Sequence, residues 1–274
     1  MIKNLLIKHM AKTGTDMWQR GWAEANGGNI SLRLNSEQRA LFELKKPLSE
    51  WIESGIKAPE LGGDIFAFTG TGRYLRNIEL APERNIGFIE LNSDATAYRI
   101  LWGFEPEGRP TSELSAHLLS HRSIKISTNN YAHAVIHTHT PKLIALTYIF
   151  DNLDTALLST MLWRMHAECV VVFPEGVEFI PWIMAGSREL GEKTAISLLK
   201  RSLVVWEHHG VIGTGRNLDE AFGRIYVAEK AAEILLTCLS VGGIRKFLSN
   251  EQLEKIASNF KCNWDKSLIV EWPE

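Results

Sequence analysis

The order of helix-like and strand-like segments is the feature that most constrains the fold of this chain. Apolar residues recur at helical spacing in some segments and alternate or run as β-branched stretches in others. Helices are predicted at residues 3–22, 111–126, 141–150, 155–165, 187–200 and 218–239. Strands are predicted at residues 30–34, 64–68, 86–91, 97–102, 134–139, 169–173 and 203–208. Because the mixture lacks the regular βαβ alternation of a doubly wound fold, it predicts a layered α/β sandwich.

Two glycine-rich turns connect the first of these segments. The helix at 3–22 leads into the turn 26–29, and this turn enters the strand at 30–34, whose period-two alternation is typical of a half-buried strand. A polar excursion over residues 35–63 precedes the strand at 64–68, which ends in the second turn, 69–72. Since no internal repeat or Ser/Gly/Pro-rich linker divides the sequence, we expect one domain over residues 1–274.

The charge balance argues against a polyanionic partner. The chain has 30 Lys and Arg against 32 Asp and Glu, a formal net charge of -2. It therefore lacks the basic excess that nucleic acid or an anionic membrane demands. The uncharged apolar stretches at 143–150 and 155–163 fall short of the roughly 18 residues that span a bilayer.

The N-terminus and the cysteines point to a soluble cytoplasmic protein. Lys3 and Lys8 interrupt the first apolar run, so we expect no signal peptide. Cys169, Cys238 and Cys262 are odd in number and far apart. That pattern predicts reduced thiols rather than a disulfide framework or a Cys-x-x-Cys zinc site.

Two histidines two residues apart are the first candidate metal ligands. His137 and His139 lie at positions i and i+2 of a predicted strand, so both rings face the same way and can bind one ion. A catalytic zinc usually has three imidazole ligands and one open position, and the third is sought at the end of a distant strand. Either His208 or His209 can supply it, and we favour His209 because Gly210 directly after it permits close backbone approach. The alternative is a paired polar face of the sheet.

A second histidine set lies on one face of a predicted helix. Glu113, His117 and His121 are spaced at i, i+4 and i+8, and His-x-x-x-His is also a metal-ligand spacing. The residue after His117 is Leu118 and not glutamate, so the metalloprotease signature is absent. We therefore expect the two helix histidines to pack or to support the ligands from behind.

Three small-residue turns form a candidate phosphate cradle. Gly70 and Gly72 suggest a dinucleotide fingerprint, but Leu75 stands where the next glycine is required, and no P-loop sequence exists. The turns 26–29, 69–72 and 111–112 offer amides, hydroxyls and backbone N–H groups that can hold a phosphate without lysine. Thr111 or Ser112 is expected to cap the following helix. Ordinary turn chemistry is the alternative for any one of them alone.

These motifs, in this order, resemble the class II aldolase/adducin family over essentially the whole chain. They are Asn26-Gly27-Gly28-Asn29, Thr69-Gly70-Thr71-Gly72, Thr111-Ser112-Glu113, His137-Thr138-His139 and His209-Gly210. The resemblance implies a three-layer αβα sandwich around a mostly antiparallel central sheet, a zinc-dependent aldolase, and a cytoplasmic homotetramer. By its length, the excursion before Asp64 and the tract 168–174, the chain resembles the family members that act on L-rhamnulose 1-phosphate more than the shorter ones that act on L-fuculose 1-phosphate, so the resemblance implies the former substrate. Its reversible cleavage, a step of rhamnose degradation, gives dihydroxyacetone phosphate and L-lactaldehyde.

The resemblance also assigns roles to individual residues. It makes His137, His139 and His209 the zinc ligands and Glu113 the catalytic acid and base. It makes Glu168 a carboxylate that reaches the site of a neighbouring subunit. Thr71 stands where the family leads us to expect serine, and the hydroxyl is kept. The residues implied to hold the substrate phosphate are Asn26, Asn29, Thr71, Gly72, Thr111 and Ser112.

Three other functions are compatible with parts of the pattern. An aldolase for another ketose 1-phosphate, such as L-fuculose 1-phosphate, needs the same metal and carboxylate. An L-ribulose-5-phosphate 4-epimerase shares the histidines, but such enzymes tend to have aspartate where this chain has Glu113. A non-catalytic, adducin-like binding domain need not keep the three histidines and the carboxylate, all of which are present here.

Overall fold

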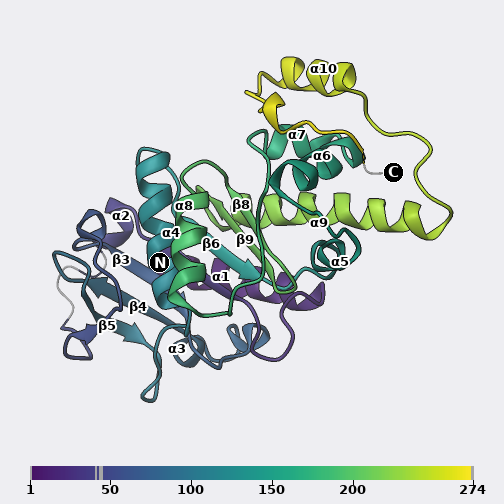
Figure 1. Ribbon diagram of the computed structural model, residues 1–274. Helices are drawn as coiled ribbons and strands as arrows, with labels where there is room; N and C mark the ends of the chain where they lie inside the picture. Colours follow the sequence, from purple (N-terminus) through teal and green to yellow (C-terminus); the bar gives the residue numbers. More distant parts are fainter. Residues whose placement is uncertain (1, 41, 43–45, 273–274) are drawn as a thin grey trace.

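The computed structural model of the protein describes residues 2–40, 42 and 46–272 (Figure 1). Its helices are α1 (Ile2–Gln19), α2 (Ser36–Arg39), α3 (Pro82–Asn85), α4 (Leu114–Ser127), α5 (Pro141–Ile149), α6 (Thr155–Met165), α7 (Glu168–Val172), α8 (Arg188–Ser197), α9 (Leu218–Ser240) and α10 (Asn250–Phe260). Its strands are β1 (Asn29–Arg33), β2 (Ile52–Glu53), β3 (Ile65–Thr69), β4 (Ile86–Leu91), β5 (Ala97–Gly103), β6 (Ala134–Thr138), β7 (Glu178–Ile180), β8 (Leu203–Trp206) and β9 (Gly210–Gly215). Short 3-10 helices lie at Pro59–Leu61, Leu75–Asn77 and Lys266–Leu268. The six predicted helices and six of the seven predicted strands are confirmed.

The strands of the described residues form one sheet in the order β2-β5-β4-β3-β1-β6-β9-β8-β7. Neighbouring strands in it run antiparallel, with β7 and β8 as the parallel pair. The predicted mostly antiparallel sheet is therefore confirmed. Asn29 of β1 lies directly opposite His137 of β6, so the centre of the sheet brings the first glycine turn beside the histidine strand.

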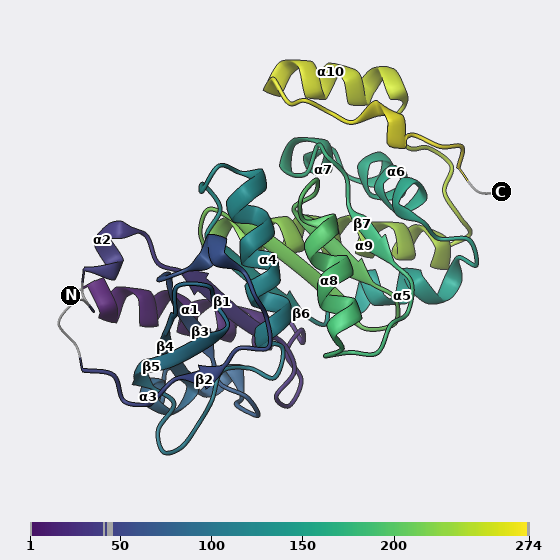
Figure 2. The same cartoon turned by 60° about the vertical axis from the view of Figure 1, so that its left-hand side comes forward.

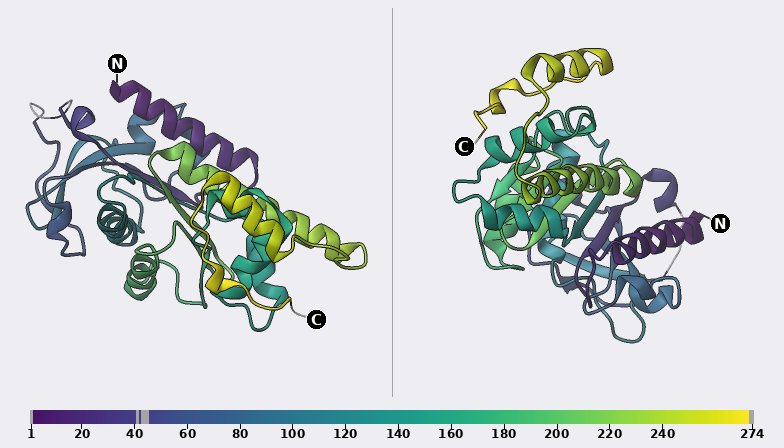
Figure 3. Two further views of the ribbon diagram at one scale, coloured as in Figure 1. Left: turned by 90° about the horizontal axis from the view of Figure 1, so that it is seen from above. Right: turned by 90° about the vertical axis from the view of Figure 1, so that its right-hand side faces the viewer.

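Helices cover both faces of this sheet. Figure 3 (left) shows α1 and α9 on one face, and Figure 2 shows α4 and α8 in front of the other. Alternate residues of a strand enter different cores: Ala134 and Ile136 of β6 join the cluster with α1 and α9, while Val135 joins the cluster with α4 and α8. This alternation is the period-two geometry of a strand, and it produces the predicted three-layer arrangement.

Strand β1 is more buried than its sequence pattern predicts. We expected a half-buried strand, but all five residues of β1 are buried because helices cover both faces. Ile30 and Leu32 pack in the core with α1 and α9. Ser31, on the opposite face, is buried against α4 by hydrogen bonds to His117 and His121. The polar positions of the alternation therefore face a helix and not water.

The strand predicted at residues 169–173 is wrong, because this segment forms helix α7. The backbone N–H of Phe173 donates to the carbonyl oxygen of Cys169, four residues earlier, as in a helical turn. Cys169 and Val170 are fully buried in the core that α6, α9 and α10 share. Tertiary packing thus overrides the strand preference of three consecutive valines. The next strand is β7, which the sequence analysis missed.

Strand β9 was also missed, because its three glycines are typical of a turn. Two of them allow helix α9 to approach the sheet. A Cβ atom at Gly213 would lie 2.5 Å from Cγ1 of Ile225, and one at Gly215 would lie 2.6 Å from the backbone nitrogen of Ala221. Helix α10 was missed as well, although a capping box at Ser249 marks its beginning.

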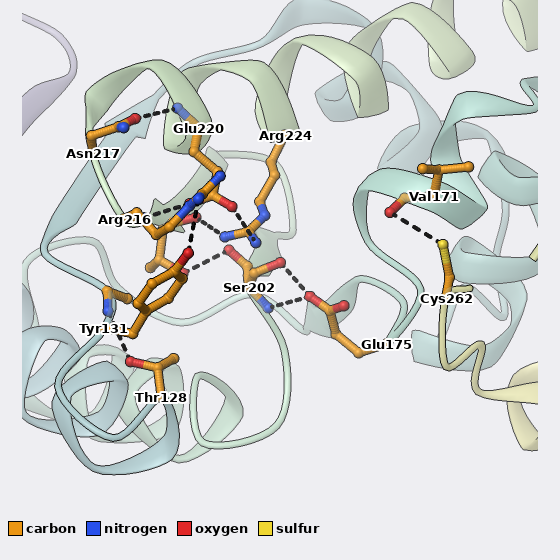
Figure 4. A network of polar contacts seen from close by, with 12 residues as sticks. Thr128, Tyr131, Val171, Glu175, Ser202, Arg216, Asn217, Glu220, Arg224 and Cys262 are labelled. Atoms are coloured by element: carbon orange, nitrogen blue, oxygen red, sulfur yellow. Dashed lines mark hydrogen bonds and ion pairs between the residues drawn. The ribbon is translucent and has the colours of Figure 1, made fainter. Parts of the chain in front are cut away.

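A polar network links the end of β9 to α9 and to Ser202, the residue before β8 (Figure 4). Arg224 donates to the carbonyl oxygen of Thr214 at 2.6 Å and pairs with Glu220 at 3.2 Å. Ser202 donates to the carboxylate of Glu175 through its backbone N–H at 3.1 Å and through its hydroxyl. These contacts hold the ends of β8 and β9 that lie away from the three histidines.

Two further sequence-based expectations concern the whole chain. Within the described residues, no helix combines the length and the apolar character that a bilayer crossing requires. Cys169, Cys238 and Cys262 are all free thiols, as predicted.

Candidate active site

Three imidazoles from two parts of the chain meet at one end of the central strands. His137 lies near the end of β6, His139 follows it, and His209 lies in the turn between β8 and β9. The ring centroids are 5.0 Å apart for the first pair, 4.9 Å for His137 and His209, and 5.1 Å for His139 and His209. One potential ligand atom from each ring lies within 4.8 Å of the others. The predicted pairing of the i and i+2 histidines and the choice of His209 both agree with this geometry.

The turn after β8 directs its two histidines in different directions. His208 has the left-handed φ of +59°, its backbone N–H donates to Oγ1 of Thr147 at 3.1 Å, and its ring stacks on Tyr148. His209 therefore turns towards β6. A Cβ atom on Gly210 would lie 2.5 Å from the carbonyl oxygen of Thr138, so a glycine is required where the turn approaches the site.

Hydrogen bonds select which ring nitrogens remain available. Nδ1 of His137 donates to the carbonyl oxygen of Val211 at 3.2 Å, and Nδ1 of His139 lies 2.5 Å from the carboxylate of Glu24. Both contacts leave the Nε2 lone pair free. Nδ1 of His209 is buried and has no hydrogen-bond partner among the residues that the structure describes. Three imidazoles with unused ring nitrogens suit a divalent cation.

Burial favours the neutral form of His137 and His209. Desolvation lowers the pKa of His137 well below its usual value, and the neighbouring rings of His139 and His209 lower it further. Burial and then His139 lower the pKa of His209, against the opposing effect of the Glu113 carboxylate. Neutral imidazole is the form that ligates a metal.

Trp206 packs against two of the three rings. Its ring centroid lies 4.6 Å from that of His137 and 5.1 Å from that of His209, on which it stacks. Its indole N–H donates to Oγ1 of Thr194 at 2.9 Å, and this fixes the ring plane. Neither Trp206 nor Glu24 was identified from the sequence, since their roles depend on neighbours that are remote along the chain.

Glu113 lies beside the three imidazoles at the beginning of α4. Its carboxylate is 3.8 Å from Nε2 of His137 and is 11% exposed, and it does not belong to the three-histidine ligand cluster. Nδ2 of Asn29 donates to it at 2.7 Å. Glu113 itself is the N-cap residue of α4 and makes no side-chain cap hydrogen bond, so neither Thr111 nor Ser112 is the N-cap residue. The hydroxyl of Thr111 nevertheless accepts the backbone N–H of Glu113 at 3.3 Å, one of the open amides at the beginning of the helix. The carboxylate of Glu113 faces the site.

The three glycine-rich and hydroxyl-rich turns converge on the same place. A cavity of about 140 Å³ is lined by the three histidines, Glu113 and all the residues predicted to hold phosphate. Gly28 and Gly72 have φ values of +74° and +65°, which glycine adopts without strain. The residues from the turns that line this cavity are Asn26, Gly27, Gly28, Asn29, Gly70, Thr71, Gly72, Thr111 and Ser112.

The remaining predicted residues lie elsewhere. His117 and His121 are fully buried and face Ser31 of β1, and neither belongs to the three-histidine cluster. Glu168 is exposed at the first turn of α7 and does not line the histidine cavity of its own chain. A larger cavity of about 690 Å³ between α4 and α8 shares Ser112 and Glu113 with the histidine cavity. The smaller cavity is the candidate active site, because the three imidazoles line it.

Known proteins share both the sequence and the fold. The family described as "Class II Aldolase and Adducin N-terminal domain" matches residues 8–236. The chain is 43% identical over 255 residues to a rhamnulose-1-phosphate aldolase of Escherichia coli O157:H7 (strain EC4115 / EHEC), covering 93% of each chain. It is 42% identical over 266 residues to a rhamnulose-1-phosphate aldolase of Enterobacter sp. (strain 638), covering 96% of this chain and 95% of the relative.

The solved structures agree with this likeness. A crystal structure of a sugar-phosphate aldolase from Thermotoga maritima matches with a TM-score of 0.77 and 30% identity, covering 89% of this chain and 99% of that one. An L-fuculose 1-phosphate aldolase matches with a TM-score of 0.61 and 21% identity over 93% of this chain and 96% of that one, which concerns the fold alone.

Proposed function

The chain belongs to the class II aldolase and adducin family, and we propose that it reversibly cleaves L-rhamnulose 1-phosphate into dihydroxyacetone phosphate and L-lactaldehyde. The observation that carries this proposal is the 43% identity to a rhamnulose-1-phosphate aldolase over 93% of both chains. The three imidazoles, the carboxylate and the phosphate-type turns around one cavity supply the groups that such a reaction needs.

The metal ligands in this proposal are His137, His139 and His209. We propose zinc, because three neutral imidazoles with an open position are the usual donor set of a catalytic zinc. When bound, the ion supplies Lewis acidity that stabilises the negative charge developing on the substrate oxygens as the carbon–carbon bond breaks. Glu24, the backbone of Val211 and the ring of Trp206 hold the imidazoles in orientation.

Glu113 is the proposed acid and base. Breaking the bond between carbons 3 and 4 leaves its electron pair on the dihydroxyacetone phosphate half. The hydroxyl on carbon 4 gives up its proton as it becomes the aldehyde carbonyl of L-lactaldehyde, and carbon 3 takes up a proton. A carboxylate beside the three imidazoles and largely shielded from water is placed for that transfer. In the synthetic direction, the same carboxylate removes the proton.

The turns are proposed to hold the phosphate end. Thr71, Gly72, Thr111 and Ser112 line the cavity with Asn26. The backbone N–H groups of Thr71 and Thr111 are donated to the carbonyl oxygens of Arg109 and Thr69, so these two residues offer their hydroxyls to a phosphate. One N–H of the Asn29 amide is already donated to Glu113, so Asn29 has its second N–H for the substrate. We also propose that the protein is a homotetramer in which Glu168 reaches the site of a neighbouring subunit. Its exposed position on α7 leaves that carboxylate available.

The test is a coupled assay for dihydroxyacetone phosphate released from L-rhamnulose 1-phosphate, beside L-fuculose 1-phosphate and L-ribulose 5-phosphate. Each is measured before and after chelation, and then with zinc restored. Metal-dependent cleavage of the first substrate is expected. Cleavage of the fuculose ester alone would move the specificity, and conversion of the ribulose ester without dihydroxyacetone phosphate would mean an epimerase. Inactivity of the zinc-loaded protein on all three would favour a binding domain.

A covalent-trapping experiment separates this chemistry from a lysine-dependent aldolase. The proposal needs no Schiff base, so borohydride added with substrate is expected to leave the mass of the protein unchanged. A trapped adduct would contradict the metal-dependent mechanism. Sedimentation analysis tests the homotetramer, and a monomer with full activity would refute the role proposed for Glu168.

A further inference from the structure

A chain of buried side chains links Glu113 to the interior of the molecule. Asn29 and Ser31 point to the same face of β1, and Glu113, His117 and His121 lie along one face of α4. The two rows alternate in contact, in the order Glu113, Asn29, His117, Ser31, His121. Ser31, His117 and His121 have no exposed surface, and Asn29 is 8% exposed. We call these five residues the relay.

The direction of each hydrogen bond in the relay follows from its first member. A carboxylate only accepts hydrogen bonds, so the contact of 2.7 Å requires that Nδ2 of Asn29 donates to Glu113. The amide oxygen of Asn29 therefore faces His117, and Nε2 of His117 must carry the proton that it donates there. Neutral imidazole has one N–H, so Nδ1 of His117 is an acceptor.

The same reasoning continues to the end of the relay. The hydroxyl of Ser31 donates to Nδ1 of His117 at 2.6 Å, and this uses its single hydrogen. Its oxygen then accepts the N–H of Nε2 of His121 at 2.7 Å. Nδ1 of His121 has no partner within the described part of the chain, so nothing there opposes this tautomer. Every proton from Glu113 to His121 is thereby assigned.

The surroundings hold both imidazoles in the neutral form. Phe66 and Phe68 of β3 contact His121 and His117 edge to face, with centroids 5.0 and 5.9 Å apart. Burial lowers the pKa of His117 to about 4 and that of His121 well below 6.5. Because each ring then has one donor and one acceptor, the relay has a single consistent direction.

We propose that Ser31, His117 and His121 are positioning residues that fix the amide of Asn29 with its NH₂ group towards Glu113. If the amide were reversed, its oxygen would face the carboxylate oxygen, leaving two buried acceptors opposed and His117 facing a donor. The relay prevents that reversal and holds the carboxylate where it exchanges a proton with carbon 3. The catalytic consequence of this inference rests on the proposed function. The directions of the hydrogen bonds do not depend on it.

The first experiment compares Ser31→Ala with Ser31→Thr in the zinc-loaded enzyme. Removal of the hydroxyl breaks the relay, and kcat is expected to fall about 10- to 100-fold, with KM and zinc content little changed. The threonine variant keeps the hydroxyl on a strand and is expected to restore most of kcat. Full kcat in the alanine variant, or a loss that threonine does not restore, would overturn the positioning role.

The second experiment reads the tautomers directly and needs neither substrate nor a variant. In the ¹⁵N-histidine-labelled protein at neutral pH, long-range ¹H–¹⁵N correlation spectra are expected to show His117 and His121 neutral, each protonated at Nε2. His117→Gln and His121→Gln identify the signals, and a lost signal suffices even if activity is impaired. A proton at Nδ1 of either ring refutes the relay. If the tautomers are as expected but no ketose phosphate is cleaved, the proposed function fails and the relay stands.

Discussion

The two walls of the active-site cavity differ in how their polar atoms are hydrogen-bonded. On the wall from β1 and α4, donors and acceptors are paired with one another from Glu113 to His121. On the wall from β6 and the β8–β9 turn, the imidazoles converge with ring nitrogens unused. Nδ1 of His121, at the inner end of the first wall, is also buried without a partner among the described residues. The second wall differs because it brings three imidazoles together at one cavity, as the proposed metal site requires. In the proposed function, the first wall positions Glu113, and the second wall, which we call the receiving wall, binds the metal.

The largest expected effect comes from breaking the receiving wall. His137→Ala removes the most buried of the three imidazoles and is expected to abolish both metal binding and cleavage. Metal content is measured by elemental analysis beside the aldolase assay. The control is His208→Asn, which changes the adjacent histidine of the β8–β9 turn to a residue that tolerates its left-handed φ. Loss of metal in the control, or retention in His137→Ala, would contradict the division between the two walls.

The second-largest expected effect comes from changing Glu113, which lies where the two walls meet. Glu113→Gln keeps a side chain that accepts the Asn29 hydrogen bond but cannot carry the proton. We expect kcat to fall about 10²- to 10⁴-fold, the range of general acid–base catalysis, with the metal retained. Metal analysis of the same sample decides the role of this residue. A metal-free Glu113→Gln protein would make Glu113 a ligand and place it on the receiving wall.

The receiving wall was the more predictable of the two from sequence. The i, i+2 spacing of His137 and His139 on a strand determines that their rings share a side, and this is a local property. His209 followed from Gly210 directly after it, where an added Cβ atom would lie 2.5 Å from the carbonyl oxygen of Thr138. The helical face of His117 and His121 was also visible in the sequence. Its partner was not, because the contact with Ser31 depends on how α4 packs on β1, 90 residues away from His121.

The errors in the fold have the same origin. The valines of α7 favour a strand locally, and the burial of Cys169 and Val170 among three helices makes the segment helical. The glycines of β9 suggest a turn until α9 is seen against Gly213. Tertiary contacts decide both cases, so the local pattern gave the wrong structure in the first and missed the strand in the second.

A smaller effect is expected at Glu24, which contacts His139 of the receiving wall. The Glu24 carboxylate orients His139 but is 64% exposed, so solvent screens it. Glu24→Gln is expected to weaken zinc affinity about tenfold, the low end of the range for groups that support metal ligands, with kcat of the saturated enzyme little changed. Competition with a chelating dye measures the affinity. Glu37→Gln, an exposed carboxylate on α2, is the control. Equal affinities in the two variants would show that Glu24 does not support the metal.

The smallest expected effect is on the free energy of unfolding, and it tests the wall from β1 and α4. Burial lowers the pKa of His121 well below 6.5, so the unfolded state takes up a proton that the folded state refuses as the pH falls below about 6.5. Wild-type stability should therefore decrease with acidification faster than that of His121→Phe, which keeps a ring against Phe66. The slope difference is at most about 1.4 kcal/mol per pH unit. Denaturant unfolding of the metal-free proteins from pH 8 to 5 measures it. Between pH 7.5 and 8 the plots of unfolding free energy against pH should run parallel for the two proteins. If they stay parallel down to pH 5, the imidazole of His121 is not held neutral, and the proposed hydrogen-bonded wall from β1 and α4 does not extend to His121.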